Sequence, residues 1–169
     1  AFEAESGLRV DILRVGDAGL MVNQSILTRD NPLGDVMFGI DNTFLTRSLD
    51  NDLFLAYESP LRATIDPALL EAVDERVTPV DVSNVCLNYD VAWFADRGLA
   101  LPESLQDLTL PAYRGLLAVE NPATSSPGLA FVLATVAAFG EEGDYTYLDF
   151  WAGLVANDVT VTEGWTDAY

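Results

Sequence analysis

Histidine and lysine are both absent from this sequence of 169 residues, and cysteine occurs once, at position 86. Without histidine, the chain cannot form a Ser-His-Asp triad, a Cys-His dyad or a metal site with imidazole ligands. A single cysteine also excludes an internal disulfide bond. We expect no metal site, no cofactor and no catalytic residue in this chain.

Basic residues are scarce as well. Eight arginines face 27 acidic residues, which gives a net charge of −19. A phosphate backbone or an anionic membrane surface would repel such a chain, so we expect no nucleic-acid partner. An acidic surface attracts cationic ligands, but it also keeps a protein soluble at high salt, and this second interpretation is the simpler one.

Long hydrophobic runs are missing too. The longest apolar helical stretch, near residues 128–139, is too short to span a bilayer, and no signal peptide is visible. We expect no membrane insertion by this segment and a targeting segment outside it. Half of the residues are apolar, enough for the core of one large domain or of two small lobes.

Strand and helix signals alternate along the first half. Apolar blocks predict strands over residues 8–15 and 35–40, and capping residues predict helices over 17–28 and 41–50. A helix tail over residues 1–6 ends at Gly7, and residues 29–34 form a turn. The side chains expected to face inward from the first long helix are those of Leu20, Met21, Ile26 and Leu27. This order favours a parallel α/β sheet.

The middle of the chain has fewer helical signals. Residues 53–67 read as extended chain, and Pro67 begins a short helix that reaches residue 73. Residues 77–80 and 82–89 are rich in β-formers. We place the crossing between two lobes here and divide the chain into residues 1–80 and 81–169.

The second half returns to the α/β style. We expect a loop with a short helix over residues 101–113, followed by strands at 116–119 and 159–162. Helices are predicted at 127–139, ended by Gly140, and at 148–156. A further helix begins close to Tyr169.

Three polar turns are candidate binding sites, because each follows a predicted strand and leads into a helix. The first holds Ser125 and Ser126 before Pro127, where free helix amides and hydroxyls suit an anion or a polar ligand. The second holds Trp165, whose flat face suits an aromatic or cationic ring. The third is Asp41 with Asn42. The simpler alternatives are helix caps for the serines and Asp41, and ordinary packing for Trp165. Cys86 lies in an apolar run and is expected to be buried.

Together these turns resemble one known family. The segments DVMFGIDNTFL, ENPATSSPGLAF and VTVTEGWTDAY are similar to motifs of the periplasmic thiamine-binding proteins of ABC importers, in the same order, and VTPVDVSNVCLNYD resembles their inter-lobe segment. The resemblance covers residues 2–169. It implies a type II periplasmic-binding fold, with two α/β lobes, crossing strands and the ligand between the lobes. It further implies that these 169 residues are incomplete at both ends relative to that fold, with a first strand before them and a return to the first lobe after them.

The resemblance also implies roles for particular residues. Ser125 and Ser126 match the hydroxyl turn that meets the hydroxyethyl or phosphate end of the ligand, and Trp165 matches an aromatic residue of the cleft. Asp41 and Asn42 match an acidic turn of the first lobe, and Tyr169 lies near the cleft. The implied partners are thiamine or its phosphates and an ABC permease, and the implied location is periplasmic or extracellular, with a possible lipid anchor.

Two alternatives remain open at this point. The same fold could bind ferric iron, a polyamine or an organic anion, although iron-binding relatives present paired tyrosines and Tyr169 is solitary. A thiamine-degrading enzyme with Cys86 as nucleophile is the other alternative, but no motif for an activating base accompanies that cysteine.

Overall fold

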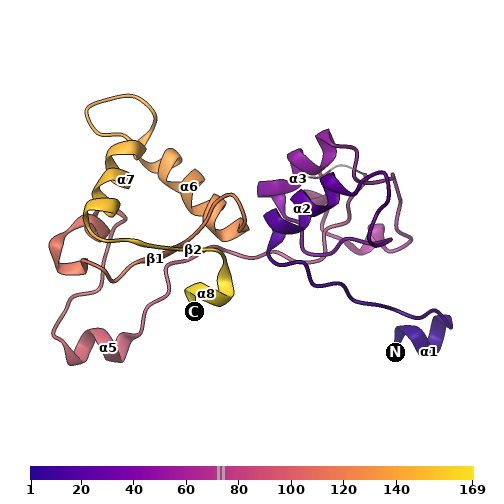
Figure 1. The fold of residues 1–169 in the computed structure, drawn as a ribbon, viewed down its shortest axis with the longest axis horizontal. Coiled ribbons are helices and arrows are strands. Elements are labelled where there is room, and N and C mark those ends of the chain that lie inside the picture. Colours follow the sequence, from indigo (N-terminus) through magenta and orange to yellow (C-terminus); the bar gives the residue numbers. More distant parts are fainter. Residues whose placement is uncertain (72, 74) are drawn as a thin grey trace.

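A computed structural model describes residues 1–71, 73 and 75–169 of the chain. Figure 1 shows two groups of elements joined by extended chain over residues 77–90. The elements of the first half are α1 (Phe2–Ser6), α2 (Ala18–Leu27), α3 (Asn42–Asp50), η1 (Arg62–Thr64) and α4 (Pro67–Glu71). Those of the second half are α5 (Val91–Asp96), η2 (Gln106–Thr109), η3 (Pro111–Tyr113), β1 (Ala118–Glu120), α6 (Ser126–Phe139), α7 (Tyr147–Ala156), β2 (Thr160–Thr162) and α8 (Trp165–Ala168).

The structure confirms the predicted helices. They were predictable because the residues that begin and end each helix lie close to it in the sequence. Gly7 ends α1 in the left-handed conformation at φ 71°, and Gly140 ends α6 at φ 72°. Asp41 caps α3 by accepting a hydrogen bond from the Thr43 amide at 2.9 Å. The helix predicted to begin at Pro67 is α4, and residue 72 of its predicted range lies outside the described residues.

One short α-helix has no counterpart among the sequence predictions, and the single turn η1 likewise interrupts the segment 53–67 that was expected to be extended. The short α-helix is α5, and its N-cap is Asp90, whose carboxylate accepts from the Trp93 amide at 3.0 Å. An aspartate before a short apolar run is typical of the start of a helix. At Asp90 this pattern was missed, because the β-rich segment 82–89 comes directly before it.

The strand predictions divide between the two halves. In the second half β1 and β2 pair in parallel, with Ala118 opposite Thr160 and Glu120 opposite Thr162, and β1 lies two residues later than expected. In the first half the strands predicted over residues 8–15 and 35–40 are wrong, because the described chain has no ladder hydrogen bonds there. The β-rich segments 77–80 and 82–89, where the crossing between lobes was expected, are extended but form no strand either. A strand needs a hydrogen-bonded neighbouring backbone, and no described segment pairs with these. Val36 and Phe38 are accordingly 89% and 73% exposed.

The inward face of α2 also differs from the prediction. Gly19 and Val22 are buried, whereas Leu20 and Leu27 are 39% and 82% exposed, so the inward placement of these two leucines is wrong. The reason is that α2 packs against α3 and that no sheet lies under its other side. Met21 and Ile26 are half-buried.

The main core lies in the second half. Leu108, Phe150 and Leu154 are buried, and Phe131, Phe139 and Trp151 pack around them. The rings of Phe139 and Phe150 stack with centroids 4.8 Å apart. This cluster joins α6, α7 and η2. It thereby fixes the position of α6, which also contacts β1.

The order β1, α6, α7, β2 with parallel strands confirms an α/β arrangement for this half of the chain. Among the residues that the structure describes, no helix is long and apolar enough to cross a membrane. Cys86 is exposed, so its predicted burial is wrong. The reason is that residues 81–90 run as extended chain without a covering element.

The excess of acidic residues predicts salt-dependent stability. The printed sequence has 27 acidic side chains against eight arginines, so most carboxylates cannot have an ion-pair partner. Salt shortens the range of their mutual repulsion from about 10 Å at 0.1 M to about 3 Å at 1 M. Thermal melts from 0.1 to 2 M KCl should therefore rise by about 5 °C or more. Sucrose at matched osmolality serves as the uncharged control, and a flat or falling KCl series would contradict the prediction.

Candidate ligand-binding site

Two of the three predicted turns meet at one edge of the sheet. Because β1 and β2 are parallel, their carboxyl ends lie side by side, and the Ser125 turn follows one while Trp165 follows the other. The Asn121 amide donates to the Thr162 carbonyl at 2.7 Å, and the Thr124 hydroxyl donates to the Glu163 carbonyl at 2.6 Å. The Ser125 turn and the residues before Trp165 are therefore tied together at one edge of the sheet.

The Ser125 turn is built by its own backbone. The amides of Thr124 and Ser125 both donate to the Asn121 carbonyl, at 3.2 and 2.9 Å, and the Ala123 amide donates to Asn121 Oδ1 at 3.0 Å. Ser125 occupies the N-cap position of α6, yet its side chain makes no capping hydrogen bond. Its hydroxyl instead donates to Glu120 Oε2. A side-chain cap is thus not the role of Ser125, which is fully buried.

Ser126 opens α6 and is 8% exposed. Its Oγ is buried and has no hydrogen-bond partner within the described part of the chain. A buried hydroxyl without a partner is uncommon, since the desolvation of a polar group costs free energy unless a partner compensates it. The start of this 14-residue helix also leaves backbone amides without intrahelical acceptors. The turn therefore retains hydrogen-bonding capacity.

The Trp165 side chain forms an aromatic pair with Tyr169. Their rings stack at a centroid distance of 4.5 Å and an interplanar angle of 22°, and they are 50% and 76% exposed. The two predicted aromatic site residues are thus brought together, on α8 and at the position after it. An exposed aromatic stack offers a flat face to a ring-bearing ligand.

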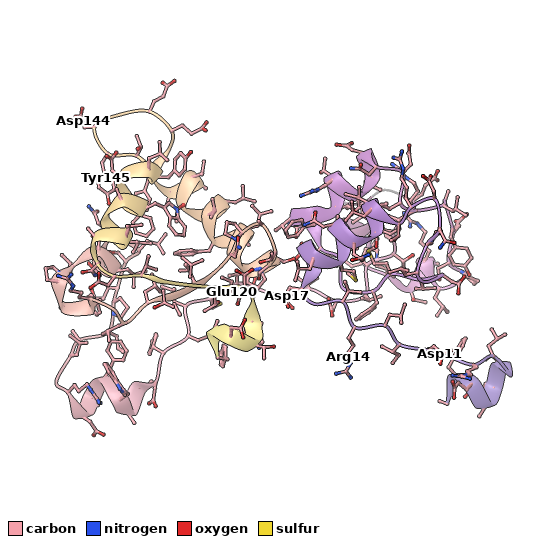
Figure 2. All side chains as sticks on the ribbon, in the orientation of Figure 1. Asp11, Arg14, Asp17, Glu120, Asp144 and Tyr145 are labelled. Atoms are coloured by element: carbon pink, nitrogen blue, oxygen red, sulfur yellow. The ribbon has the colours of Figure 1, made fainter. Side chains whose placement is uncertain are left out.

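A carboxylate from the first half reaches this edge. Asp17 precedes α2, where it was expected to cap that helix, but its side chain makes no capping bond. Asp17 Oδ2 accepts instead from the Trp165 amide at 3.1 Å. The Gly19 amide next to it donates to the Thr124 carbonyl at 3.0 Å. Figure 2 shows Asp17 and Glu120 where the two groups of elements meet. We call the set Asp17, Glu120–Ser126 and Glu163–Trp165 the strand-end site.

Asp41 and Asn42 occupy a different position. Both are exposed, and Asp41 Oδ1 accepts from the amide and the hydroxyl of Thr43, at 2.9 and 2.6 Å. The cap interpretation of Asp41 is therefore confirmed. No hydrogen bond or ion pair links either residue with the strand-end site in the described ranges, and ligand contact by either stays a prediction.

Sequence reasoning missed the two carboxylates of the strand-end site. From the sequence, Glu120 received no role beyond its place at the start of the segment ENPATSSPGLAF, and Asp17 was treated only as a helix cap. Each acts through a partner that the sequence does not pair with it, Ser125 in one case and the Trp165 amide, 148 residues away, in the other. A carboxylate at the end of a predicted parallel strand is the signal that could have identified Glu120.

Two cavities occur in the second half of the chain, and neither is lined by Ser125 or Trp165. One of about 240 Å³ is lined mainly by apolar and aromatic side chains, among them Tyr89, Trp93 and Phe94. The other, of about 280 Å³, lies against the sheet and is lined by Val161, Trp151 and Glu120, among others. The second cavity thus reaches the strand-end site at Glu120, whereas the first is lined by none of its residues.

Comparisons with known proteins agree on one family. The family described as bacterial extracellular solute-binding protein matches residues 31–164. A thiamine-binding periplasmic protein of Salmonella typhimurium is 26% identical over 169 residues, which is 100% of this chain and 49% of that protein. The proteins of the same name from Escherichia coli and Brucella abortus are 25% and 22% identical, over 100% and 99% of this chain and 49% and 47% of theirs. The chain thus spans about half the length of these relatives. No solved structure matches it.

Proposed function

Because the chain belongs to the bacterial extracellular solute-binding protein family, we propose that it is the solute-binding component of an ABC importer and captures a thiamine-class molecule. The strand-end site forms one side of the binding cleft. The protein works outside the cytoplasmic membrane, in a periplasmic or extracellular location, and delivers its ligand to the permease.

The observation that carries this proposal is the convergence at the strand ends. Trp165, the Ser125 turn and Asp17 come from three distant parts of the chain and are tied together by hydrogen bonds. Ligands of open α/β sheets bind beyond the carboxyl ends of the strands. The names of the three relatives support the choice of thiamine.

The chemistry of thiamine suits this edge. Its thiazolium ring is cationic and its pyrimidine is aromatic, and both match the exposed face of the Trp165–Tyr169 stack. The carboxylates of Asp17 and Glu120 attract the positive charge. The hydroxyethyl tail suits the start of α6, where Ser126 Oγ lacks a partner. Ser125 is fully buried and its hydroxyl donates to Glu120, so it stabilises the turn. It would contact the ligand only if the turn changes conformation on binding.

The proposal includes two lobes. Residues 1–80 form part of the first lobe and residues 81–169 form the second, with the crossing near residues 80–86. Asp41 and Asn42 would then face the ligand from the first lobe. Closure of the lobes around the ligand would bury the aromatic stack, and the permease would recognise the closed form.

Calorimetry on the full-length protein tests the ligand. Thiamine should bind saturably with a stoichiometry of one, whereas spermidine, ferric citrate and succinate should give no binding heat. Binding of one of these three in place of thiamine would keep the family and replace the ligand. Release of free pyrimidine from thiamine in the presence of a nucleophile would identify an enzyme instead of a binding protein.

A further inference from the structure

Glu120 lies where a bound anion would be expected. It is the last residue of β1, and its carboxylate accepts the hydroxyl hydrogen of Ser125 at the start of α6. Gly128 lies so close to the Glu120 carbonyl group that a side chain at this position would collide with it. The N-terminus of a 14-residue helix is therefore fixed against a residue that carries a negative charge.

The Glu120 carboxylate already accepts one of the hydrogen bonds that this turn could donate to a bound anion. The N-terminus of a helix attracts negative charge because its free amides and its dipole point the same way. Ser125 has a single hydroxyl hydrogen, and it is directed to Glu120. What remains for a ligand at this turn is the partnerless Ser126 hydroxyl, which can accept and donate.

A second carboxylate strengthens the negative field. Asp17 lies against Gly164 and accepts from the Trp165 amide on the other side of the same edge. Among the described residues, no arginine forms an ion pair with Asp17 or Glu120. The ion pairs of Arg9, Arg29, Arg76 and Arg114 in these residues join them to other aspartates. In the part of the chain that the structure describes, this edge thus carries two carboxylates that no arginine pairs with.

We propose that Glu120 determines the charge of the ligand, so that the strand-end site takes thiamine with a free hydroxyethyl tail and discriminates against its phosphate esters. This inference rests on the proposed function. A phosphate monoester carries about −1.5 to −2 charges at pH 7 and would lie next to a carboxylate. Like charges placed together at an interface are a strong source of selectivity. A hydroxyl tail meets no such repulsion.

The test compares thiamine with thiamine monophosphate by calorimetry on the full-length protein. The parent should bind thiamine about 10-fold or more tightly than the monophosphate. Glu120→Gln retains an oxygen that accepts from Ser125 and removes the charge, so it should reduce this preference about 10-fold by tightening the monophosphate. Glu142→Gln removes the same charge from the exposed loop between α6 and α7, where Figure 2 shows Asp144, and should leave the preference unchanged.

A second measurement requires no variant and therefore does not depend on how Glu120→Gln folds. In the parent, raising KCl from 0.1 to 1 M should narrow the preference for thiamine, because salt screens the repulsion of the phosphate. The inference is wrong if the parent binds both ligands equally, or if neither Glu120→Gln nor salt changes the ratio. If the parent binds neither ligand, the proposed function fails first.

Discussion

Replacing Gly128 by alanine should destabilise the protein and distort the strand-end site. The added Cβ would lie 2.8 Å from the Glu120 carbonyl carbon, closer still to its oxygen, and 3.0 Å from the Asn121 carbonyl carbon. These are backbone atoms, so they can move only if β1 and α6 separate. Alanine gains about 1 kcal/mol in helix propensity, but overpacking against backbone costs more, and we expect a net loss of about 1–3 kcal/mol.

Urea denaturation of the full-length protein measures this loss, and thiamine calorimetry measures its effect on the site. Gly34→Ala is the matched control, because nothing lies within 4 Å of a Cβ built there. The control should unfold at the same urea concentration as the parent and bind thiamine with the same affinity. Equal stability of Gly128→Ala and the parent would mean that α6 and β1 are not packed as closely as described.

Replacing Trp165 by alanine should weaken the binding of thiamine and thiamine monophosphate by similar factors, up to about 30-fold. An aromatic face against a cation contributes up to about 2 kcal/mol when desolvated, which corresponds to that factor. The two ligands share both rings, so the loss should be common to them. Trp165 is half exposed, so the variant should keep most of its stability.

Two further observations make this result decisive. Trp165→Phe retains a ring that can stack on Tyr169 and should recover part of the affinity. Glu120→Gln should change the ratio of the affinities for thiamine and thiamine monophosphate. Trp165→Ala should lower both affinities and leave their ratio unchanged. If Trp165→Ala binds both ligands like the parent, Trp165 is a packing residue and its assignment to the cleft is wrong.

Helices were predictable from the sequence because their signals lie within a few residues of one another. Gly7, Asp41 and Gly140 each end or begin a helix through contacts with their own neighbours. A strand depends on a partner that can lie anywhere in the chain. The segment with Val36 and Phe38 has the composition of a buried strand, but without a neighbouring strand it remains extended and exposed.

The same distinction applies to the strand-end site. Its location followed from the sequence, since the Ser125 turn and Trp165 each lie within a few residues of the end of a segment that was predicted to be a strand and forms one. Its charges did not, because Asp17 and Glu120 acquire their positions from contacts between segments. A prediction from one sequence could assign to Asp17 only the local role of a helix cap, and the structure gives its carboxylate a partner from the other half of the chain.

The hydrogen bond between Asp17 and the Trp165 amide has a consequence for the order in which the protein folds. Its two residues are separated by 148 positions, and the nearby Gly19–Thr124 bond also spans most of the chain. Contacts between distant residues form slowly, because a long loop must close before they add any stability. During synthesis the Asp17 carboxylate therefore gains its partner on α8 only after Trp165 has emerged. The strand-end site is among the last parts of the molecule to assemble, and a ligand that binds it would favour completion of folding.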